Sequence, residues 1–143
     1  IKNSVKLDVI GDTNALSEKL NKVIAESKQK TANNAEHTLN IAVNYGGRQE
    51  IVNAVKKIIA DGNDVTVDSI SANLYTAQSG EPDLIIRTGG ELRLSNFMLF
   101  QGAYAELYFT DVLWPDFDEK EFDKALISFS NRKRRFGKVN DNA

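Results

Sequence analysis

The sequence contains no cysteine, and it has only one histidine among its 143 residues. The absence of cysteine excludes disulfides, thiolate metal sites and cysteine nucleophiles, and it is compatible with a reducing cytoplasm. The single histidine, His37, lies in a segment that we expect to form a loop before a strand. We therefore interpret His37 as a surface residue rather than as a catalyst or a metal ligand.

An excess of charge of one sign is also missing, because 18 basic and 20 acidic side chains leave a formal net charge of −2. No overall field therefore favours nucleic acid or an anionic membrane, and any anion site has to be built locally. No apolar run approaches the length of a membrane span, and no signal peptide is recognisable. These absences predict a cytoplasmic protein without a nucleic-acid partner.

The chain has the composition of an ordinary globular protein, with 41% hydrophobic and 27% charged residues. Its length suits a single domain, 1–143, that buries a core of its own. The first residue, Ile1, is not an initiator, and Lys2–Ile10 has the character of the middle of a fold. We therefore expect the front of a longer protein to be absent.

Short β-rich runs alternate with segments of helical periodicity. Strands are predicted at Val5–Ile10, Leu39–Tyr45, Leu84–Ile86 and Glu106–Thr110. Helices are predicted after Asp12 and up to Asn33, from about Arg48 to Gly62, from Asp68 to Thr76, from about Asn96 to Tyr104, and from Asp118 to about Arg134. This alternation predicts an α/β fold with a mostly parallel central sheet flanked by helices.

Two details of these helices can be tested against a structure. We expect Asp12, Thr13 or Asn14 to cap the first long helix. On the second helix, an apolar stripe predicts the face that packs into the core, and its members are Ile51, Val52, Val55, Ile58 and Ile59.

Two glycine pairs lie where an α/β protein would hold a ligand. In open α/β sheets, ligands bind beyond the carboxyl ends of the strands. Gly46-Gly47 and Gly89-Gly90 each follow a predicted strand, and glycine lets the backbone turn tightly and approach a ligand. The segment Pro82–Asn96 around the second pair is the most informative part of the sequence.

Arg87 stands at the end of the third predicted strand, and Arg93 and Ser95 would point to one side in an extended backbone. Ser95 would also open a helix, whose unpaired N–H groups favour anions. Together these groups predict a diphosphate site. The same residues allow a simpler interpretation, in which Arg87 pairs with Glu91 and Ser95 is only an N-cap.

Five blocks of sequence occur in order along the chain: NYGGRQE at 44–50, RTGGELRLSNF at 87–97, QGAYAELYF at 101–109, LWPDF at 113–117 and RRFG at 134–137. In this combination the chain resembles the cis-prenyltransferases. These enzymes lengthen prenyl diphosphates with isopentenyl diphosphate, and they include undecaprenyl diphosphate synthase, which makes the lipid carrier of the bacterial cell wall.

The resemblance implies that Arg87, Arg93 and Ser95 hold the diphosphate of isopentenyl diphosphate, beside the Leu94 backbone, and that Glu91 orients the arginines. It also implies a set of residues that support the pocket, namely Asn44, Gly46, Gly47, Arg48, Gly89 and Gly90. Arg48, taken alone, fits a surface position at a tight turn equally well.

The resemblance further implies Mg²⁺ as the cofactor, with Glu106 as a ligand. A single protein carboxylate is compatible with this role, since Mg²⁺ binds few carboxylates together with substrate phosphates. In one unbroken helix Ser95 and Glu106 would lie about 16 Å apart along the axis, too far to serve one diphosphate. The helix must therefore end near Tyr104 so that Glu106 returns on a strand, or another chain must contribute. Without the resemblance, Glu106 would be interpreted as a solvated or salt-bridged acid.

The family's closing Arg-x-Gly motif reaches across a homodimer to the partner's active site, and Arg135 and Gly137 match it. The basic run Arg132–Arg135 is also explained by helix macrodipole compensation. The resemblance thus implies a homodimer, and a lipid product that could bring the enzyme into peripheral contact with a membrane.

The sequence lacks the family's Asp-Gly-Asn-x-Arg-Trp loop, which binds the allylic prenyl diphosphate and carries the catalytic aspartate, and it also lacks the family's aromatic and Ser/Glu segment after the second strand. The resemblance therefore implies the C-terminal part of an enzyme that condenses isopentenyl diphosphate with an allylic diphosphate. This part would carry the isopentenyl diphosphate half-site, no catalytic residue, and no activity alone. Two alternatives stay open: a non-catalytic accessory subunit of a prenyltransferase, and a phosphate- or nucleotide-binding α/β domain.

Overall fold

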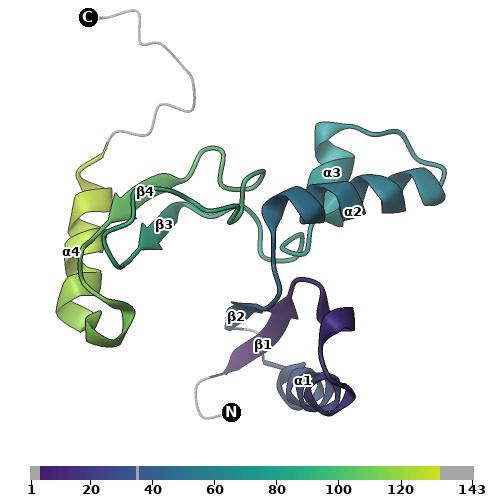
Figure 1. The fold of residues 1–143 in the computed structure, drawn as a ribbon, viewed down its shortest axis with the longest axis horizontal. Coiled ribbons are helices and arrows are strands. Elements are labelled where there is room, and N and C mark those ends of the chain that lie inside the picture. Colours follow the sequence, from purple (N-terminus) through teal and green to yellow (C-terminus); the bar gives the residue numbers. More distant parts are fainter. Residues whose placement is uncertain (1–3, 35, 133–143) are drawn as a thin grey trace, which may run out of the picture. The chain divides into compact units, whose positions relative to one another are not determined.

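The computed structural model describes residues 4–34 and 36–132 of the chain. The chain divides into two compact units, Ile1–Gly80 and Glu81–Ala143. Figure 1 labels the helices and strands of each unit. The expectation of a single domain over 1–143 stays a prediction.

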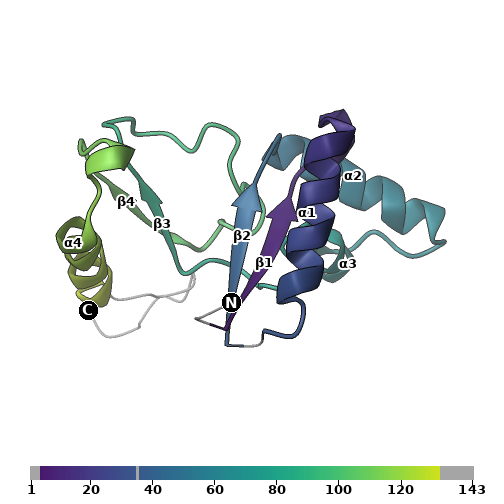
Figure 2. The ribbon, with the colours of Figure 1, turned by 90° about the horizontal axis from the view of Figure 1, so that it is seen from below.

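The first unit begins with a parallel pair of strands joined through a helix. The elements are β1 (Val5–Ile10), the short 3₁₀ helix η1 (Thr13–Ala15), α1 (Glu18–Thr31) and β2 (His37–Ala42). The two strands run in register along six residues each, from Val5 opposite His37 to Ile10 opposite Ala42. α1 lies along one face of this pair (Figure 2). This is the strand–helix–strand unit that the alternation in the sequence predicts.

The start of α1 differs from the prediction. Asp12 accepts a hydrogen bond from the Asn14 N–H at 3.0 Å and so caps η1, not the long helix. The cap of α1 is Ser17, whose Oγ accepts from the Leu20 N–H at 3.3 Å. The prediction that a residue at 12–14 caps the long helix is therefore wrong, because a separate 3₁₀ turn comes between the strand and the helix.

β2 also starts earlier and ends earlier than predicted. His37 is the first residue of the strand, not part of a loop before it, because it pairs in register with Val5 at the start of β1. Its side chain is exposed, as expected. The described residues contain no group of three or more His, Cys, Asp or Glu side chains that could hold a metal ion.

Two further helices, α2 (Gly47–Ala60) and α3 (Val67–Asn73), pack on each other in the first unit. Ile58 is 1% exposed, but Val52 is 45% and Ile59 63% exposed, so part of the predicted apolar stripe is wrong. The buried positions of α2 are Gly47, Glu50, Ala54 and Ile58. Their spacing is helical, and the face is formed mainly by small residues and a carboxylate, which an apolar pattern does not reveal.

The second unit contains a second parallel strand pair and a final helix. The elements are β3 (Leu84–Arg87), β4 (Glu106–Phe109), the 3₁₀ helix η2 (Trp114–Asp116) and α4 (Glu119–Ser130). α4 packs beside β4, and its Ala125 has no exposed surface. The helix is capped by Asp118 and ends at Ser130, earlier than the predicted end near Arg134, and residues from 133 onward lie outside the described part.

The predicted helix from Asn96 to Tyr104 is wrong. Ser95, Asn96 and Met98 have φ values of 46°, 65° and 48°, in the left-handed region, which a continuous right-handed helix does not allow. Isolated turns take its place, such as the one closed by the Gly102 N–H on the Met98 carbonyl at 2.9 Å. The link between the parallel strands β3 and β4 is therefore built from turns.

The observed architecture confirms the predicted fold class, parallel strands flanked by helices. Each strand pair is parallel, and each unit has a small core of its own, with Ile10, Ala54, Ile58 and Leu74 in the first and Ile85 and Ala125 in the second. None of the helices in the described part of the chain has both the length and the apolar character that crossing a bilayer requires.

Candidate functional site

A tight turn follows β3 in the second unit. Gly89 and Gly90 have φ values of 85° and 78°, which side chains with a Cβ rarely adopt. Their N–H groups donate to the carbonyls of Val112 and Thr110, each at 2.9 Å. The turn is thereby attached to the chain that leaves β4, and it fixes the direction in which residues 91–97 continue.

Arg87, the last residue of β3, connects the two ends of this loop. Its Nη1 donates to the Ser95 Oγ at 3.0 Å and to the main-chain carbonyl of Arg93. The structure thus brings Arg87 together with Ser95 and with the Arg93 backbone. Ser95 does not open a helix, so neither its predicted place at a helix N-terminus nor the simpler N-cap interpretation is right.

The Arg93 side chain turns to Glu91 instead. Arg93 Nη1 donates to Glu91 Oε2, and the two side chains are 62% and 49% exposed. An exposed ion pair of this kind contributes about 0–1 kcal/mol, so it can rearrange at little cost. Of the two arginines, Glu91 contacts only Arg93, and the alternative pairing of Arg87 with Glu91 is not observed.

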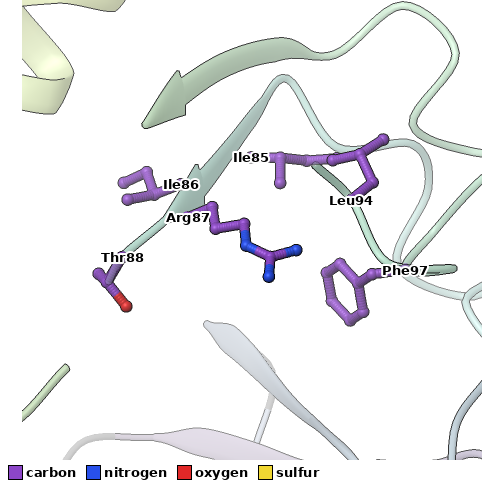
Figure 3. Close-up of a pocket in the computed structure, with 6 residues that line it drawn as sticks. All are labelled: Ile85, Ile86, Arg87, Thr88, Leu94 and Phe97. Carbon is purple, nitrogen blue, oxygen red and sulfur yellow. The ribbon is translucent and has the colours of Figure 1, made fainter. Parts of the chain in front are cut away.

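A cavity of about 250 Å³ lies at the end of β3. Figure 3 shows the guanidinium of Arg87 and the ring of Phe97 pointing toward one another across it. The six described residues that line it are Ile85, Ile86, Arg87, Thr88, Leu94 and Phe97, and Arg87 alone among them carries a charge. The cavity therefore combines one cationic group and one threonine with four apolar side chains. Arg93 and Ser95 stand beside it and are not among the lining residues.

Glu106 lies at the first position of β4, so the chain does return on a strand after Tyr104. Its Oε2 accepts from Arg132 Nη1 at 2.7 Å, and the two side chains are 26% and 34% exposed respectively. The strand register pairs Glu106 with Leu84 and Arg87 with Phe109. Glu106 and Arg87 are thus three residue steps apart, about 10 Å along the strands, at opposite ends of the pair.

Glu106 is the one carboxylate that the predicted metal site takes from this chain. A single carboxylate is a reasonable partial ligand for Mg²⁺, which takes its other oxygens from water and substrate phosphates. In this structure the two side chains have separate partners, Arg132 for Glu106 and Ser95 for Arg87. The return on a strand meets the first of the two conditions, and the contribution of another chain stays a prediction.

The predicted supporting residues at the other glycine pair belong to the first unit. Asn44 has a φ of 48°, and its Nδ2 donates to the Asp12 carbonyl at 3.0 Å, which joins the turns after β1 and β2. Gly46 is the N-cap of α2 with an extended backbone, Gly47 is buried, and Arg48 is exposed. These contacts explain how the turn is held, and they do not test a role in binding.

Glu50 is a residue that the sequence reasoning missed, although it closes the NYGGRQE block. It is 1% exposed, its Oε1 accepts from the Tyr75 N–H at 2.8 Å, and its Oε2 accepts from the Tyr45 hydroxyl. Tyr45 and Tyr75 meet edge to face, with ring centroids 6.3 Å apart. The buried carboxylate therefore ties the turn before α2 to the end of α3. The signal available in the sequence was a polar residue at helical spacing from Ala54 and Ile58, on the face of α2 that is buried.

Comparison with known proteins identifies the family. Residues 1–137 match the family model described as "Putative undecaprenyl diphosphate synthase". The chain belongs to this family. Among curated relatives of the family, an isoprenyl transferase of Fusobacterium nucleatum is 54% identical over 140 residues, which are 97% of this chain and 60% of that protein. A ditrans,polycis-undecaprenyl-diphosphate synthase of Shewanella oneidensis is 48% identical over 95% of this chain and 52% of its own length.

Two solved structures of diphosphate synthases agree with this chain in fold. A probable undecaprenyl diphosphate synthase from Campylobacter jejuni superposes with a TM-score of 0.89 at 37% identity, over 96% of this chain and 65% of that chain. Lavandulyl diphosphate synthase from Lavandula x intermedia, in complex with dimethylallyl diphosphate, also gives 0.89, at 38% identity over 94% and 61%. The chain thus spans between about half and two thirds of the prenyltransferases it matches. Arg135 and Gly137, which are predicted to reach the active site of a dimer partner, lie outside the described residues.

Proposed function

We propose that this chain is the isopentenyl diphosphate-binding portion of an isoprenyl transferase, and that it corresponds to the C-terminal part of its relatives. The observation that carries the proposal is the cavity at the end of β3. It places one guanidinium, from Arg87, beside Thr88 and four apolar side chains. A ligand with an anionic head and a short apolar tail suits these walls. The volume of the cavity, about 250 Å³, lies below the roughly 300–1,000 Å³ of sites for drug-sized ligands, which favours a small ligand.

The diphosphate head takes its contacts from three groups. Arg87 and Ser95 already lie within 3.0 Å of one another, and both can turn toward a diphosphate oxygen. Arg93 joins them when it leaves its exposed pair with Glu91, and arginine is well suited to phosphate oxygens because its donors form a planar fork. The backbone at Leu94 lies beside them. The turn at Gly89 and Gly90 holds the loop in reach.

The reaction that this portion serves is cis-prenyl chain elongation, as in undecaprenyl diphosphate synthesis. The π-electrons of isopentenyl diphosphate form a new C–C bond to the allylic carbon, the allylic C–O bond breaks with loss of diphosphate, and a proton leaves. This chain contributes by holding the isopentenyl diphosphate in place, which is a proximity effect. The catalytic aspartate motif is not in its sequence, so we expect the chain alone to be inactive.

Mg²⁺ is the proposed cofactor, and when bound it stabilises the charge of the departing diphosphate. Glu106 is its proposed ligand in this chain. Because Glu106 and Arg87 lie at opposite ends of one strand pair, a second copy is proposed to complete the site, with Arg135 and Gly137 at the junction. We propose a cytoplasmic homodimer that comes into peripheral contact with a membrane through its lipid product.

Calorimetry with isopentenyl diphosphate and ADP as competing ligands tests the proposal. We expect binding of isopentenyl diphosphate, and Arg93→Ala should weaken it by about 1–3 kcal/mol, the scale of lost hydrogen bonds to a charged group. Lys56→Ala removes an exposed cation of α2 and is the matched control, with no expected change. Tighter binding of ADP than of isopentenyl diphosphate would favour a nucleotide-binding domain instead.

A further inference from the structure

The ion pair between Glu106 and Arg132 joins two elements that are distant in sequence. Glu106 begins β4, and Arg132 follows the C-terminal turn of α4, 26 residues later. The 2.7 Å contact is a charge-assisted hydrogen bond between side chains that are only about a quarter and a third exposed. The arginine thereby fastens the end of α4 to the start of the strand on which α4 packs.

The two backbone hydrogen bonds at the end of α4 show what this contact holds. The Asn131 N–H donates to the Ile127 carbonyl at 3.2 Å, and the Arg132 N–H donates to the Phe129 carbonyl at 3.0 Å. The last turn of a helix frays easily because its final carbonyls have no partner further along the helix. The side chain of Arg132 is therefore one contact that ties this turn to the neighbouring strand.

The same carboxylate is the group that a divalent cation would use. Arg132 already holds Oε2 of this carboxylate, and a cation bound to Glu106 would place a second positive charge within a few ångströms of the guanidinium, so the two repel each other and compete for one negative charge. Simultaneous contact is therefore unfavourable. Since Arg132 sits on a helix end rather than within a strand, it is the partner that can move away.

We propose that Arg132 is a positioning residue that occupies Glu106 in the absence of a divalent cation, and that cation binding at Glu106 displaces it and loosens the C-terminal turn of α4. The proposal rests on the proposed function only in placing a divalent cation at Glu106. It adds that metal loading and the position of the end of α4 are coupled, since each uses the same carboxylate.

The test is a Mn²⁺ titration of the purified protein, with free Mn²⁺ measured by its paramagnetic resonance signal. Mn²⁺ serves as the probe because it accepts the same oxygen ligands as Mg²⁺. Arg132→Gln should tighten Mn²⁺ binding about two- to fivefold, the range expected for removing a partly exposed competing charge. Arg132→Lys, which keeps the charge, should remain near the wild type. Lys124→Gln removes another ion-paired cation of α4, the partner of Glu121, and is the matched control.

Hydrogen exchange supplies the second readout. Mn²⁺ should accelerate exchange at the amides of Asn131 and Arg132 in the wild type and have no further effect in Arg132→Gln. This measurement on the wild-type protein also decides the question where Arg132→Gln does not fold.

Three results separate the possible failures. Unchanged or weaker Mn²⁺ binding in Arg132→Gln, with binding abolished in Glu106→Gln, would overturn the displacement and leave the proposed metal ligand standing. Mn²⁺ binding that survives Glu106→Gln would remove the cation from Glu106, and the displacement with it. Exchange at the end of α4 that is indifferent to Mn²⁺ would overturn the coupling.

Discussion

Glu50 offers the sharpest test of how the turn before α2 is held. The carboxylate is 1% exposed and accepts hydrogen bonds from the Tyr75 N–H at 2.8 Å and from the Tyr45 hydroxyl. Hydrogen bonds to a charged group contribute about 1.5–3 kcal/mol each, and a truncated buried side chain also leaves a cavity. We therefore expect Glu50→Ala to lower the free energy of unfolding by about 3–5 kcal/mol.

Urea unfolding followed by circular dichroism measures this loss. Gln49→Ala is the matched control, because Gln49 is the exposed neighbour on the same helix, and it should change stability by less than about 0.5 kcal/mol. Tyr45→Phe removes one of the two contacts, and a double-mutant cycle with Glu50→Ala should give a coupling of about 1–3 kcal/mol. The reasoning would be refuted by a loss for Glu50→Ala no larger than that for Gln49→Ala, or by a coupling of zero.

Three further predictions concern packing and charge. Gly11→Ala should destabilise the protein by about 2–4 kcal/mol in urea unfolding, because Gly11 has a φ of 117° and a Cβ there would lie 2.1 Å from a backbone oxygen. The control Gly62→Ala places its Cβ within 4 Å of no atom and should cost only about 1–2 kcal/mol from its left-handed φ, so equal losses would contradict the prediction. Ala125→Leu should cost about 1–3 kcal/mol by overpacking the contact of α4 with β4, and a neutral result would show that the contact is loose. The pKa of Lys124 is raised by its hydrogen bond to Glu121 and by the attraction of that carboxylate. The small stabilisation from this pair therefore holds at neutral pH and is lost as the pH rises from 10.5 through the raised pKa. Unfolding curves of the wild type and Lys124→Gln should converge only in that alkaline range.

The sequence predicted the elements whose local signals agree with their tertiary setting. β1 and β3 are short β-rich runs bounded by turn residues, and β1 has its predicted bounds. The resemblance to the family rested on blocks such as RTGGELRLSNF, and the comparison with known proteins confirmed it. Such blocks carry the identity because their glycines and charged groups are spaced for a particular loop, whose detailed path is not needed to recognise them.

The errors arose where backbone or packing overrode the local pattern. The run after Ser95 contains good helix formers, yet Ser95, Asn96 and Met98 are left-handed, which no composition signal announces. The buried face of α2 was missed because Ala54 and Glu50 contribute to it while more apolar neighbours are exposed. The predicted return of the chain on a strand at Glu106 is confirmed, whereas the residue that lies opposite Glu106 could not be predicted, because pairing between strands sets the register.

Calorimetric titration of isopentenyl diphosphate into the wild type, Arg87→Ala and Arg87→Lys tests the central claim most directly. Arg87 is the charged residue among the described residues that line the cavity, so its loss should weaken binding by about 1.5–3 kcal/mol. The lysine variant should recover only part of the loss because it lacks the planar fork. Equal affinity in all three proteins would contradict the assignment of the diphosphate to this cavity.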